Sequence, residues 1–425
     1  MESNEFITTT KPLKARVKER YIDFIVEEIY EEDGQIKKCV VDRYNLPFEE
    51  RINKNHVLDI SESTEFDQVI VEMEKINTDT NTALALIARG IGVSKNRLGY
   101  GGLKDKRGIT CQRISIYQPN LEKLKKFGVK GIELKNARWA KDRLELGHLK
   151  GNEFTIILRQ INESEEEIKQ IIQDFSNQIK NGIPNFFGNQ RFGGKRMVTH
   201  RVGKLLLKED FESAIKLYLT ETYEEEKIEI KTARINFAKT FDVAKALREF
   251  PRKDCRTELA ILNSLIKEPN NYQQAFHTLP KKTRYLFIHA YQSYLFNKMI
   301  EKRIERLGKN ALLPQEGDIL VNGKATALLV GYQTELATGI QGEIEQEVIN
   351  NEGIKLEDFI VKGQSELSSQ GNRKEISLEI KDFKLESIFD DEFNKGQKAI
   401  KITFYLDKGN YATTVLKELI KEEVF

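Results

Sequence analysis

Alternating hydrophobic and polar residues predict β-strands in several parts of the chain. The clearest case is residues 399–406, where Ile400, Ile402, Phe404 and Leu406 alternate with more polar residues, as in a strand with one buried face. Similar runs predict strands at residues 23–29, 109–117 and 154–159. Because these strands are half polar, we expect them to form a mainly antiparallel sheet.

Apolar residues at helical spacing predict helices between these strands. Ser164 and Glu167 form a capping-box pattern before an apolar stripe that ends at Gly182. A longer amphipathic pattern runs from about residue 283 to residue 307 and ends at Gly308, and a shorter one follows residues 79–82 and ends near Gly90. Helices and strands mixed in this way indicate an α+β fold.

The composition is that of a soluble, globular chain. With 425 residues the chain is long enough for two domains, and its 39% hydrophobic and 32% charged residues are typical of a charged surface around apolar cores. No stretch approaches the roughly 18 apolar residues of a membrane span. Residues 1–10 lack the apolar centre of a signal peptide, so we expect a cytoplasmic protein.

Cysteine and histidine give no indication of a metal site. The five histidines are scattered without the spacing of metal ligands. The cysteines are few and odd in number, and their spacing suggests neither disulfides nor a thiolate site: they are Cys39, Cys111 and Cys255.

The charge distribution is more informative than the net charge of +2. Basic residues cluster at residues 11–20, 104–113, 123–130 and 191–204, whereas acidic residues cluster at residues 27–33, 163–167 and 221–226. The acidic clusters are typical of solvated faces. Several basic clusters adjoin the candidate site described next, which favours contact with a phosphate backbone.

The segment from Gly101 to Gln112 carries the strongest candidate chemistry. It places one carboxylate, Asp105, among three cations in a glycine-flanked loop between a predicted helix and a predicted strand. Loops held between rigid elements often carry functional groups. Asp105 is therefore a candidate nucleophile or general base, although an Asx-turn in a solvated loop would use the same residue.

The same segment resembles the signature of the TruD family of tRNA pseudouridine synthases, which carries the catalytic aspartate. Further motifs of that family follow in order at residues 23–28, 149–155, 183–193, 290–297 and 409–414. The resemblance covers residues 14–420. The fixed positions of the signature are filled here by Gly102, Lys104, Asp105, Gly108, Thr110 and Gln112.

This resemblance implies both an architecture and an activity. It implies a pseudouridine synthase domain of residues 1–205 and 376–425, interrupted by a TRUD insertion domain of residues 206–375. It also implies isomerisation of uridine to pseudouridine in tRNA, with uridine 13 as the leading target and without a cofactor or metal. We expect the protein to act as a monomer with no membrane partner.

The resemblance assigns the catalytic role to Asp105. The sequence leaves open whether Asp105 adds to C6 or C1′ of the nucleotide or takes a proton during elimination. Members of the family pair this aspartate with a basic side chain, and the corresponding residue here is Lys18, with Lys104 as the alternative partner. Such a cation holds a carboxylate ionised and oriented.

Other residues match positions at which the family contacts nucleotides. Phe187 corresponds to the residue that stacks on the target uracil, an interaction worth roughly 1–3 kcal/mol. Asn185 would hydrogen-bond the uracil edge or hold the loop. Phe24 and Tyr411 lie where the family places further nucleotide contacts. Gln190 and Arg191 are predicted either to bind substrate phosphate or to buttress the loop.

Two other interpretations fit the sequence less well than the resemblance does. A phosphate-cradling loop at residues 101–108 would need a Gly-Lys-Ser/Thr ending and a helix directly after it, and both are missing. An RNA-binding protein without catalysis would not need Asp105, Lys104 and Phe187 together, and all are present. Three residues on the long predicted helix, Gln292, Ser293 and Asn297, are expected to be structural.

Overall fold

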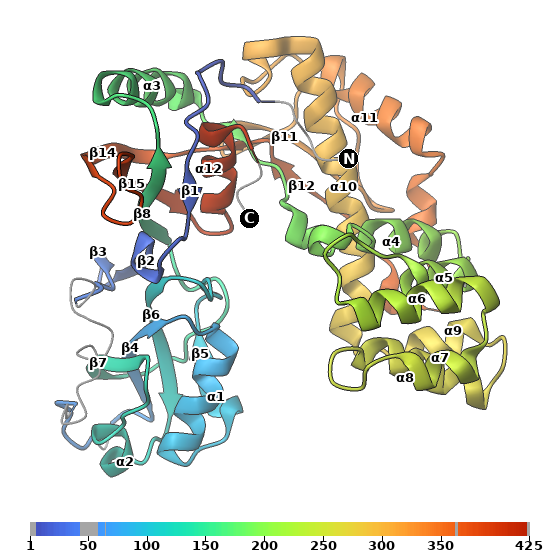
Figure 1. Cartoon of the computed structure of the whole chain (residues 1–425), viewed down its shortest axis with the longest axis horizontal. Coiled ribbons are helices and arrows are strands. Elements are labelled where there is room, and N and C mark those ends of the chain that lie inside the picture. The colour runs from blue at the N-terminus through green and yellow to red at the C-terminus, as the bar shows by residue number, and fades with distance from the viewer. Residues whose placement is uncertain (1–5, 43–57, 64, 362–363, 423–425) are drawn as a thin grey trace. The chain divides into compact units, whose positions relative to one another are not determined.

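A computed structural model describes residues 6–42, 58–63, 65–361 and 364–422 of the chain (Figure 1). The chain forms two compact units. We call residues 8–183 and 379–425 the sheet unit, and residues 1–7 and 184–378 the helical unit.

The sheet unit contains a long, mainly antiparallel sheet, as the half-polar strands predicted. In its described part, β2 and β6 run parallel and the other neighbours along its main path run antiparallel. The short strands β1 (Arg16–Val17), β3 (Gln35–Lys38) and β5 (Leu98–Tyr100) pair with β8, β2 and β6. The main path runs in the order β14 (Lys381–Asp390), β15 (Lys398–Asp407), β8 (Gly151–Ile161), β2 (Phe24–Glu32), β6 (Ile109–Tyr117), β4 (Gln68–Ile76) and β7 (Ile132–Ala140).

The four predicted strands are confirmed as β2, β6, β8 and β15. In β15 the residues at even positions from 400 to 406 are buried, whereas Lys401, Thr403 and Tyr405 are partly exposed. The strand therefore has the one buried face that its sequence pattern predicts.

A row of phenylalanine rings crosses the sheet and joins segments that lie far apart in the sequence. The ring of Phe154 in β8 lies 6.1 Å from that of Phe24 and 5.4 Å from that of Phe404. Phe383 in β14 continues the row, 6.0 Å from Phe404 and 5.3 Å from Phe175 in α3 (Glu165–Gln178). The row thus packs aromatic rings from β2, β8, β15, β14 and α3 against one another.

The helices of the sheet unit begin and end as their capping residues predict. Ser164 and Glu167 form the predicted capping box of α3, and the helix is followed by a 3-10 turn that ends at Gly182. Asp79 caps α1 (Thr80–Ile91) by accepting a hydrogen bond from the backbone N–H of Thr82. The other helices of this unit are α2 (Leu121–Lys125) and α12 (Ala412–Ile420).

The helical unit is built around one long helix. This helix, α10 (Lys281–Leu307), confirms the predicted pattern and ends at Gly308. A small antiparallel sheet contains β10 (Leu320–Val321), β11 (Lys324–Leu329) and β12 (Asn372–Glu375), and β9 (Ile183–Pro184) and β13 (Ser377–Leu378) lie where the chain passes between units. The other helices are α4 (Thr199–Leu207), α5 (Phe211–Thr220), α6 (Ile228–Thr240), α7 (Val243–Glu249), α8 (Arg256–Lys267), α9 (Tyr272–His277) and α11 (Gly339–Glu352).

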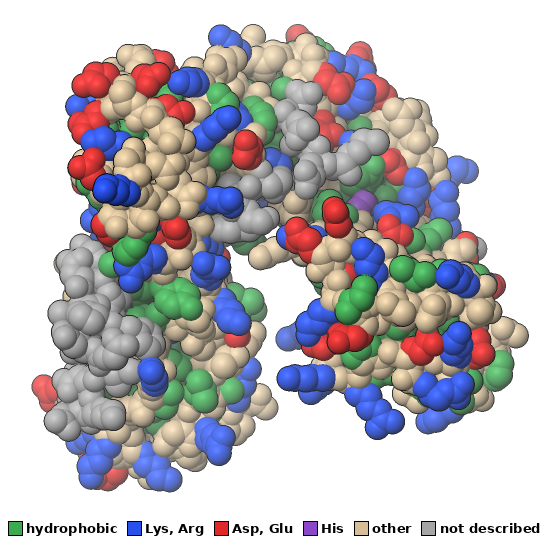
Figure 2. Space-filling model, viewed as in Figure 1, with side chains coloured by type: hydrophobic (Ala, Val, Ile, Leu, Met, Phe, Trp, Pro, Cys, Tyr) green, Lys and Arg blue, Asp and Glu red, His purple; other side chains and the backbone are tan. Residues whose placement is uncertain are grey.

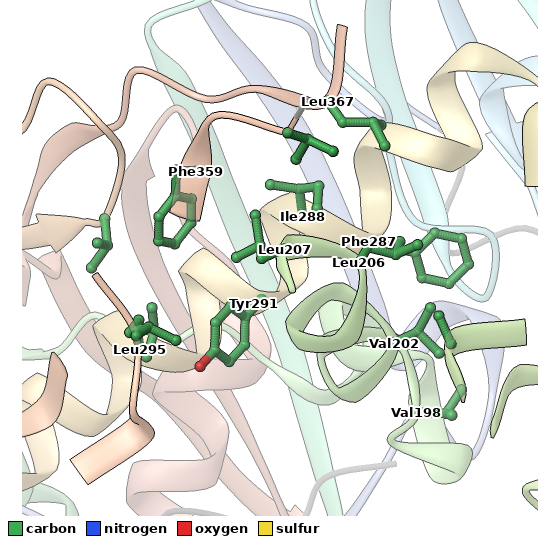
Figure 3. Close-up of a cluster of buried hydrophobic side chains, with 14 of the residues drawn as sticks. Val198, Val202, Leu206, Leu207, Phe287, Ile288, Tyr291, Leu295, Phe359 and Leu367 are labelled. Atoms are coloured by element: carbon green, nitrogen blue, oxygen red, sulfur yellow. The ribbon is translucent and has the colours of Figure 1, made fainter. Parts of the chain in front are cut away.

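Charged side chains of both signs cover the visible face of each unit (Figure 2), while the core of the helical unit is apolar. Val202 and Leu206 of α4 face Phe287, Tyr291 and Leu295 of α10 in that core (Figure 3). α4 and α10 approach closely at Gly203, where an added Cβ would overlap the carbonyl oxygen of Phe287.

The units divide the chain at residues 183/184 and 378/379, whereas the sequence predicted boundaries at 205/206 and 375/376. Residues 184–205 join the helical unit because Phe186 and Phe187 pack against its core and α4 packs against α10. The motif at residues 183–193 therefore belongs mostly to the helical unit. The sequence pattern did not reveal this, because the packing partners of these residues lie about a hundred residues further along the chain.

No helix within the described residues is long and apolar enough to span a membrane.

Replacing Gly203 by alanine is expected to destabilise the helical unit. Alanine in a helix gains roughly 0.5–1 kcal/mol over glycine, but overpacking a core typically costs about 1–3 kcal/mol, and here the clash is with backbone. We expect a net loss of about 1–2 kcal/mol in the free energy of unfolding, measured by urea denaturation.

The matched control is Gly128→Ala, because an added Cβ at Gly128 has no neighbour within 4 Å. A Gly203→Ala protein as stable as this control would show that α4 and α10 are not in close contact.

Candidate active site

Asp105 lies in the loop that joins β5 to β6, and its carboxylate is within reach of solvent. Its side chain is 44% exposed, and Oδ1 accepts a hydrogen bond of 3.0 Å from Nζ of Lys18. The structure thus brings together the two residues that the resemblance pairs.

The loop around Asp105 is held by hydrogen bonds to neighbouring elements. Thr80 at the start of α1 accepts from the backbone N–H of Lys104 at 3.0 Å, and its hydroxyl donates to Gln112. Gln112 in turn donates to the carbonyl of Gly102 at 2.9 Å. Thr80 and Gln112, the second of which belongs to the signature, therefore orient the backbone that carries Asp105.

Gly108 ends the loop where β6 comes close to β2. A Cβ at this position would lie 2.5 Å from the carbonyl oxygen of Phe24. Any larger residue would push the start of β6 away from β2, and glycine is required for that reason.

Lys18 is a desolvated cation. Its side chain is 8% exposed, its backbone has a left-handed φ of 55°, and Nζ lies 3.8 Å from the ring centroid of Phe24. Burial lowers the pKa of Lys18, and Asp105 partly offsets this effect. A poorly hydrated ammonium beside a solvent-accessible carboxylate is well suited to orient that carboxylate.

Lys104, the alternative partner of Asp105, points elsewhere. Its Nζ donates to Oε2 of Glu28 at 3.0 Å, and Nε of Arg113 contacts Oε1 of the same carboxylate at 3.3 Å. Glu28 is fully buried and both cations are nearly so. Lys104 therefore ties the Asp105 loop to β2, and of the two candidate lysines it is Lys18 that contacts Asp105.

The first acidic residue of the N-terminal motif shapes the turn after Lys18. Asp23 is completely buried, accepts from the backbone N–H of Arg20 at 2.7 Å and pairs with Arg159 at 2.9 Å. Arg159 also contacts Asp391 at 3.1 Å. This buried cluster fixes the chain between Lys18 and β2.

Phe24 has a different environment from the one predicted. It is 1% exposed, because its ring packs against Phe154 on one side and supports the Lys18 ammonium. No face of the ring is accessible to a nucleotide in this structure. We therefore correct the assignment of Phe24 from a nucleotide contact to a support for Lys18.

Lys75 is a site residue that sequence reasoning missed. It lies near the end of β4, is 1% exposed, and donates to the backbone carbonyl of Asp105 at 2.7 Å. Burial lowers its pKa to about 8, against the opposing effect of Asp105. A single lysine in a strand carries no sequence signal for such a role, because its target is a backbone atom of another segment.

The loop that carries Asn185 and Phe187 lies in the helical unit, where α10 clamps it. The side chain of Asn297 accepts from the backbone N–H of Phe187 and donates to its carbonyl, both at 2.9 Å. Asn185 donates through Nδ2 to the carbonyl of Glu375 at 3.1 Å, so here it holds the loop. The structural role predicted for Asn297 is confirmed by these contacts.

The ring of Phe187 is half-buried and lies among aromatic and cationic groups. It packs edge-on against Phe296 at 5.5 Å, and the Arg191 guanidinium lies 5.4 Å from its centroid. Nζ of Lys374, which sequence reasoning also missed, lies 5.0 Å from both rings and donates to the carbonyl of Asn185. Burial lowers the pKa of Lys374 to about 7.

The remaining predicted substrate-binding residues differ in exposure. Gln190 is exposed, and Arg191 donates through Nε to the hydroxyl of Ser293 at 3.0 Å. Tyr411 is 63% exposed at the N-cap of α12, so its ring is free to stack. Asp105, Lys18, Lys104, Phe24 and Tyr411 belong to the sheet unit. The helical unit contains Asn185, Phe187, Gln190 and Arg191.

One cluster within the described residues has side chains that could hold a metal ion. It consists of Cys39, Glu72 and Cys111, whose ligand atoms lie within 4.8 Å of one another. All three are buried, and burial raises the pKa of both thiols and of Glu72. The cluster joins β6, β4 and the segment after β3 inside the sheet unit.

Comparison with known proteins covers both units. A family model described as tRNA pseudouridine synthase D (TruD) matches residues 1–327 and 321–419. The chain belongs to the TruD family.

Individual relatives of this TruD-family chain match over nearly their whole length. A Methanosarcina mazei protein named Probable tRNA pseudouridine synthase D is 36% identical over 451 residues, covering 98% of this chain and 96% of its own. One of the same name from Methanosarcina acetivorans is 34% identical over 452 residues, covering 98% and 95%. A crystal structure of TruD from Methanosarcina mazei matches with a TM-score of 0.80 and 33% identity, covering 99% of this chain and 96% of that one.

Substitutions of Lys104 and Lys18 are expected to change the stability of this TruD-family chain by very different amounts. Lys104→Met leaves the buried carboxylate of Glu28 with Arg113 alone, and losing one partner of a buried ion pair costs about 3–5 kcal/mol. Lys18→Met removes a desolvated cation from a half-exposed carboxylate, so stability should change by less than ~1 kcal/mol. Urea denaturation measures both, and equal losses in the two variants would contradict the assignments.

Lys75 should make stability depend on pH above neutrality. Its pKa is about 8 in the folded chain and about 10.4 when unfolded. Between these values the unfolded state binds more protons, so folding stability rises with pH through this window by up to ~1.4 kcal/mol per pH unit. Lys75→Met should reduce the slope of stability against pH in denaturation curves recorded from pH 7.5 to 10 and leave the part due to Lys374, whose pKa is also lowered, whereas Lys106→Gln, a change to an exposed neighbour, should keep the full slope.

Proposed function

We propose that this chain isomerises uridine to pseudouridine in tRNA, with uridine 13 as the target, and that Asp105 is the catalytic carboxylate. The single observation that carries this proposal is the solvent-accessible Asp105 carboxylate, held 3.0 Å from the desolvated Lys18 ammonium in a loop with a fixed backbone. As a member of the TruD family, the chain is a tRNA pseudouridine synthase.

The reaction itself requires few groups. The C1′–N1 glycosidic bond breaks, the uracil ring turns, a C1′–C5 bond forms, and the proton on C5 moves to solvent while N1 gains one. Atoms and electrons balance within the nucleotide, so the proposal needs no cofactor. An ionised carboxylate beside the sugar either adds to C1′ or C6 or removes a proton during elimination, and the Asp105 geometry suits each of these steps.

Lys18 acts on Asp105 in this scheme. Its position above the Phe24 ring and its low exposure leave few water molecules to compete for its charge, so its interaction with the Asp105 carboxylate is strengthened. Lys75 adds a hydrogen bond to the Asp105 carbonyl. We assign Lys18 as the partner of the carboxylate and Lys75 and Lys104 as positioning residues.

The helical unit supplies the candidate surface for the base. Phe187 presents a half-buried ring on a loop whose backbone is clamped by Asn297, which fits a stacking platform for uracil. In this proposal the sheet unit is the pseudouridine synthase domain, and the helical unit is the TRUD insertion. The protein acts as a cytoplasmic monomer.

Asp105→Asn is expected to abolish pseudouridine formation while tRNA affinity stays within several-fold. The amide is nearly isosteric, but it carries no charge and serves neither as base nor as nucleophile. The measurement is single-turnover conversion of a tRNA transcript, with pseudouridine located by chemical labelling and primer extension.

Asp33→Asn provides the matched control. Asp33 lies in an exposed turn with a left-handed φ of 52°, a conformation that asparagine also adopts, so conversion should be unchanged. If Asp105→Asn kept a tenth of the wild-type rate, the catalytic role of this residue would be refuted. Labelling at another position would refute uridine 13 alone.

A further inference from the structure

The basic segment at residues 191–204 is largely neutralised within the helical unit. Lys195 pairs with Glu225, Arg201 with Glu221 at 2.5 Å, and Lys204 with Glu352 at 2.6 Å. The guanidinium of Arg196 donates to the backbone carbonyls of Tyr218 and Glu221. RNA phosphates would have to compete with these carboxylates, so the segment is a weaker candidate for a phosphate contact than its composition suggests.

A second basic segment in the same unit is mostly not neutralised by carboxylates. This segment comprises residues 245–256 and runs from within α7 through the following turn to the start of α8. It contains five Lys or Arg and two Asp or Glu. Its net charge is therefore +3, compared with +2 for the whole chain. All five cations are exposed. Lys and Arg side chains are visible along the edge of the helical unit where α7 and α8 lie (Figure 2).

The two carboxylates of this segment are already engaged by other groups. Glu249 accepts from Asn236 at 3.1 Å and lies 3.8 Å from Lys245, and Asp254 pairs with Lys227 of the adjoining segment at 3.0 Å. Among the described residues, no carboxylate pairs with the other four cations of the segment. These four, Arg248, Arg252, Lys253 and Arg256, form what we call the α7–α8 edge.

The backbone of the α7–α8 edge is anchored on both sides of its turn. Phe250 and Cys255 are 2% and 1% exposed and pack in the core of the helical unit. The N–H of Cys255 donates to the carbonyl of Pro251 at 3.0 Å, which closes the turn. Arg252 and Lys253 are therefore presented from a fixed backbone, which reduces the ordering entropy lost when a ligand binds.

We propose that the α7–α8 edge binds phosphates of the tRNA backbone. The proposal rests on the proposed function for the identity of the polyanion, and the edge lies outside the residues assigned to catalysis. Uncompensated cations that attract a polyanion release its counterions, and this makes the affinity dependent on salt. Contacts to phosphates carry no sequence information, so this contact adds affinity and orientation without sequence preference.

The test compares two variants with the same change in charge. One variant replaces Arg248, Arg252, Lys253 and Arg256 by glutamine. The control replaces four exposed lysines dispersed through the same unit, which also lack a pairing carboxylate in the described chain: Lys208, Lys267, Lys282 and Lys309.

Fluorescence anisotropy with full-length tRNA gives the dissociation constant at several salt concentrations. Each lost phosphate contact lowers the slope of log affinity against log salt by roughly 0.7–0.9, so the edge variant should lose about three units of slope. Its affinity at low salt should fall at least about tenfold. The control should keep the slope of the wild-type protein, and single-turnover conversion at saturating tRNA should stay within about twofold in both variants.

Equal slopes of log affinity against log salt in the edge variant and the control would overturn the proposal. The α7–α8 edge would then be a candidate surface for another partner, such as an acidic protein. If the fourfold variant failed to fold, the double variant Arg252→Gln, Lys253→Gln in the exposed turn would serve in its place. Its slope of log affinity against log salt should fall by about half as much as expected for the fourfold variant. An unchanged slope in the double variant would again overturn the proposal. Failure of the proposed function gives a different result, because a wild-type protein that binds tRNA with this salt dependence but forms no pseudouridine refutes the chemistry alone.

Discussion

The buried carboxylate of Glu28 is the constraint on which the arrangement around Asp105 depends. A fully buried charge is tolerated only when opposite charges and hydrogen bonds surround it. Lys104 comes from the loop that carries Asp105, and Arg113 comes from the strand that follows it. Satisfying one carboxylate on β2 therefore ties the middle of that loop and the following strand, β6, to β2. The buried carboxylate of Glu28 holds the loop in place, and the loop in turn orients the partly exposed carboxylate of Asp105.

The same principle sorts the many lysines and arginines of this chain by function. Cations that neutralise a buried acid, such as Arg159 and Lys104, stabilise the fold and are unavailable to a ligand. Lys18 and Lys75 are nearly as buried, but they contact the side chain and the backbone of a single solvent-accessible residue. The four cations of the α7–α8 edge, which pair with no carboxylate among the described residues, lie on the surface. Composition does not separate these classes, whereas pairing in three dimensions does.

Local patterns predicted the fold better than they predicted the site. The strand at β15 and the helices α3 and α10 follow from periodicity and capping, which act over a few residues. Asp105 and Lys18 were identified because family motifs label them, and the structure shows them in contact.

Contacts between distant segments were not predictable from the sequence. Lys75 and Lys374 donate to backbone carbonyls of other segments, which leaves no residue-type signal. The burial of Phe24 depends on Phe154, and the basic segment at residues 191–204 is neutralised in part by the acidic segment at residues 221–226. The first boundary between the compact units differs from the predicted domain boundary for the same reason, since Phe187 packs against a helix a hundred residues away.

The order of strands in the sheet has a consequence for the synthesis of the chain. β8 lies between β2, which precedes it, and β15, which is the last strand of the described chain. While a ribosome adds the helical unit, the edge of β8 that will pair with β15 has no partner, and open strand edges promote aggregation. The helical unit is nearly continuous in sequence and has its own core, so it is able to fold during this interval. The row of rings that ends beneath Lys18 therefore lacks Phe404 until β15 has left the ribosome.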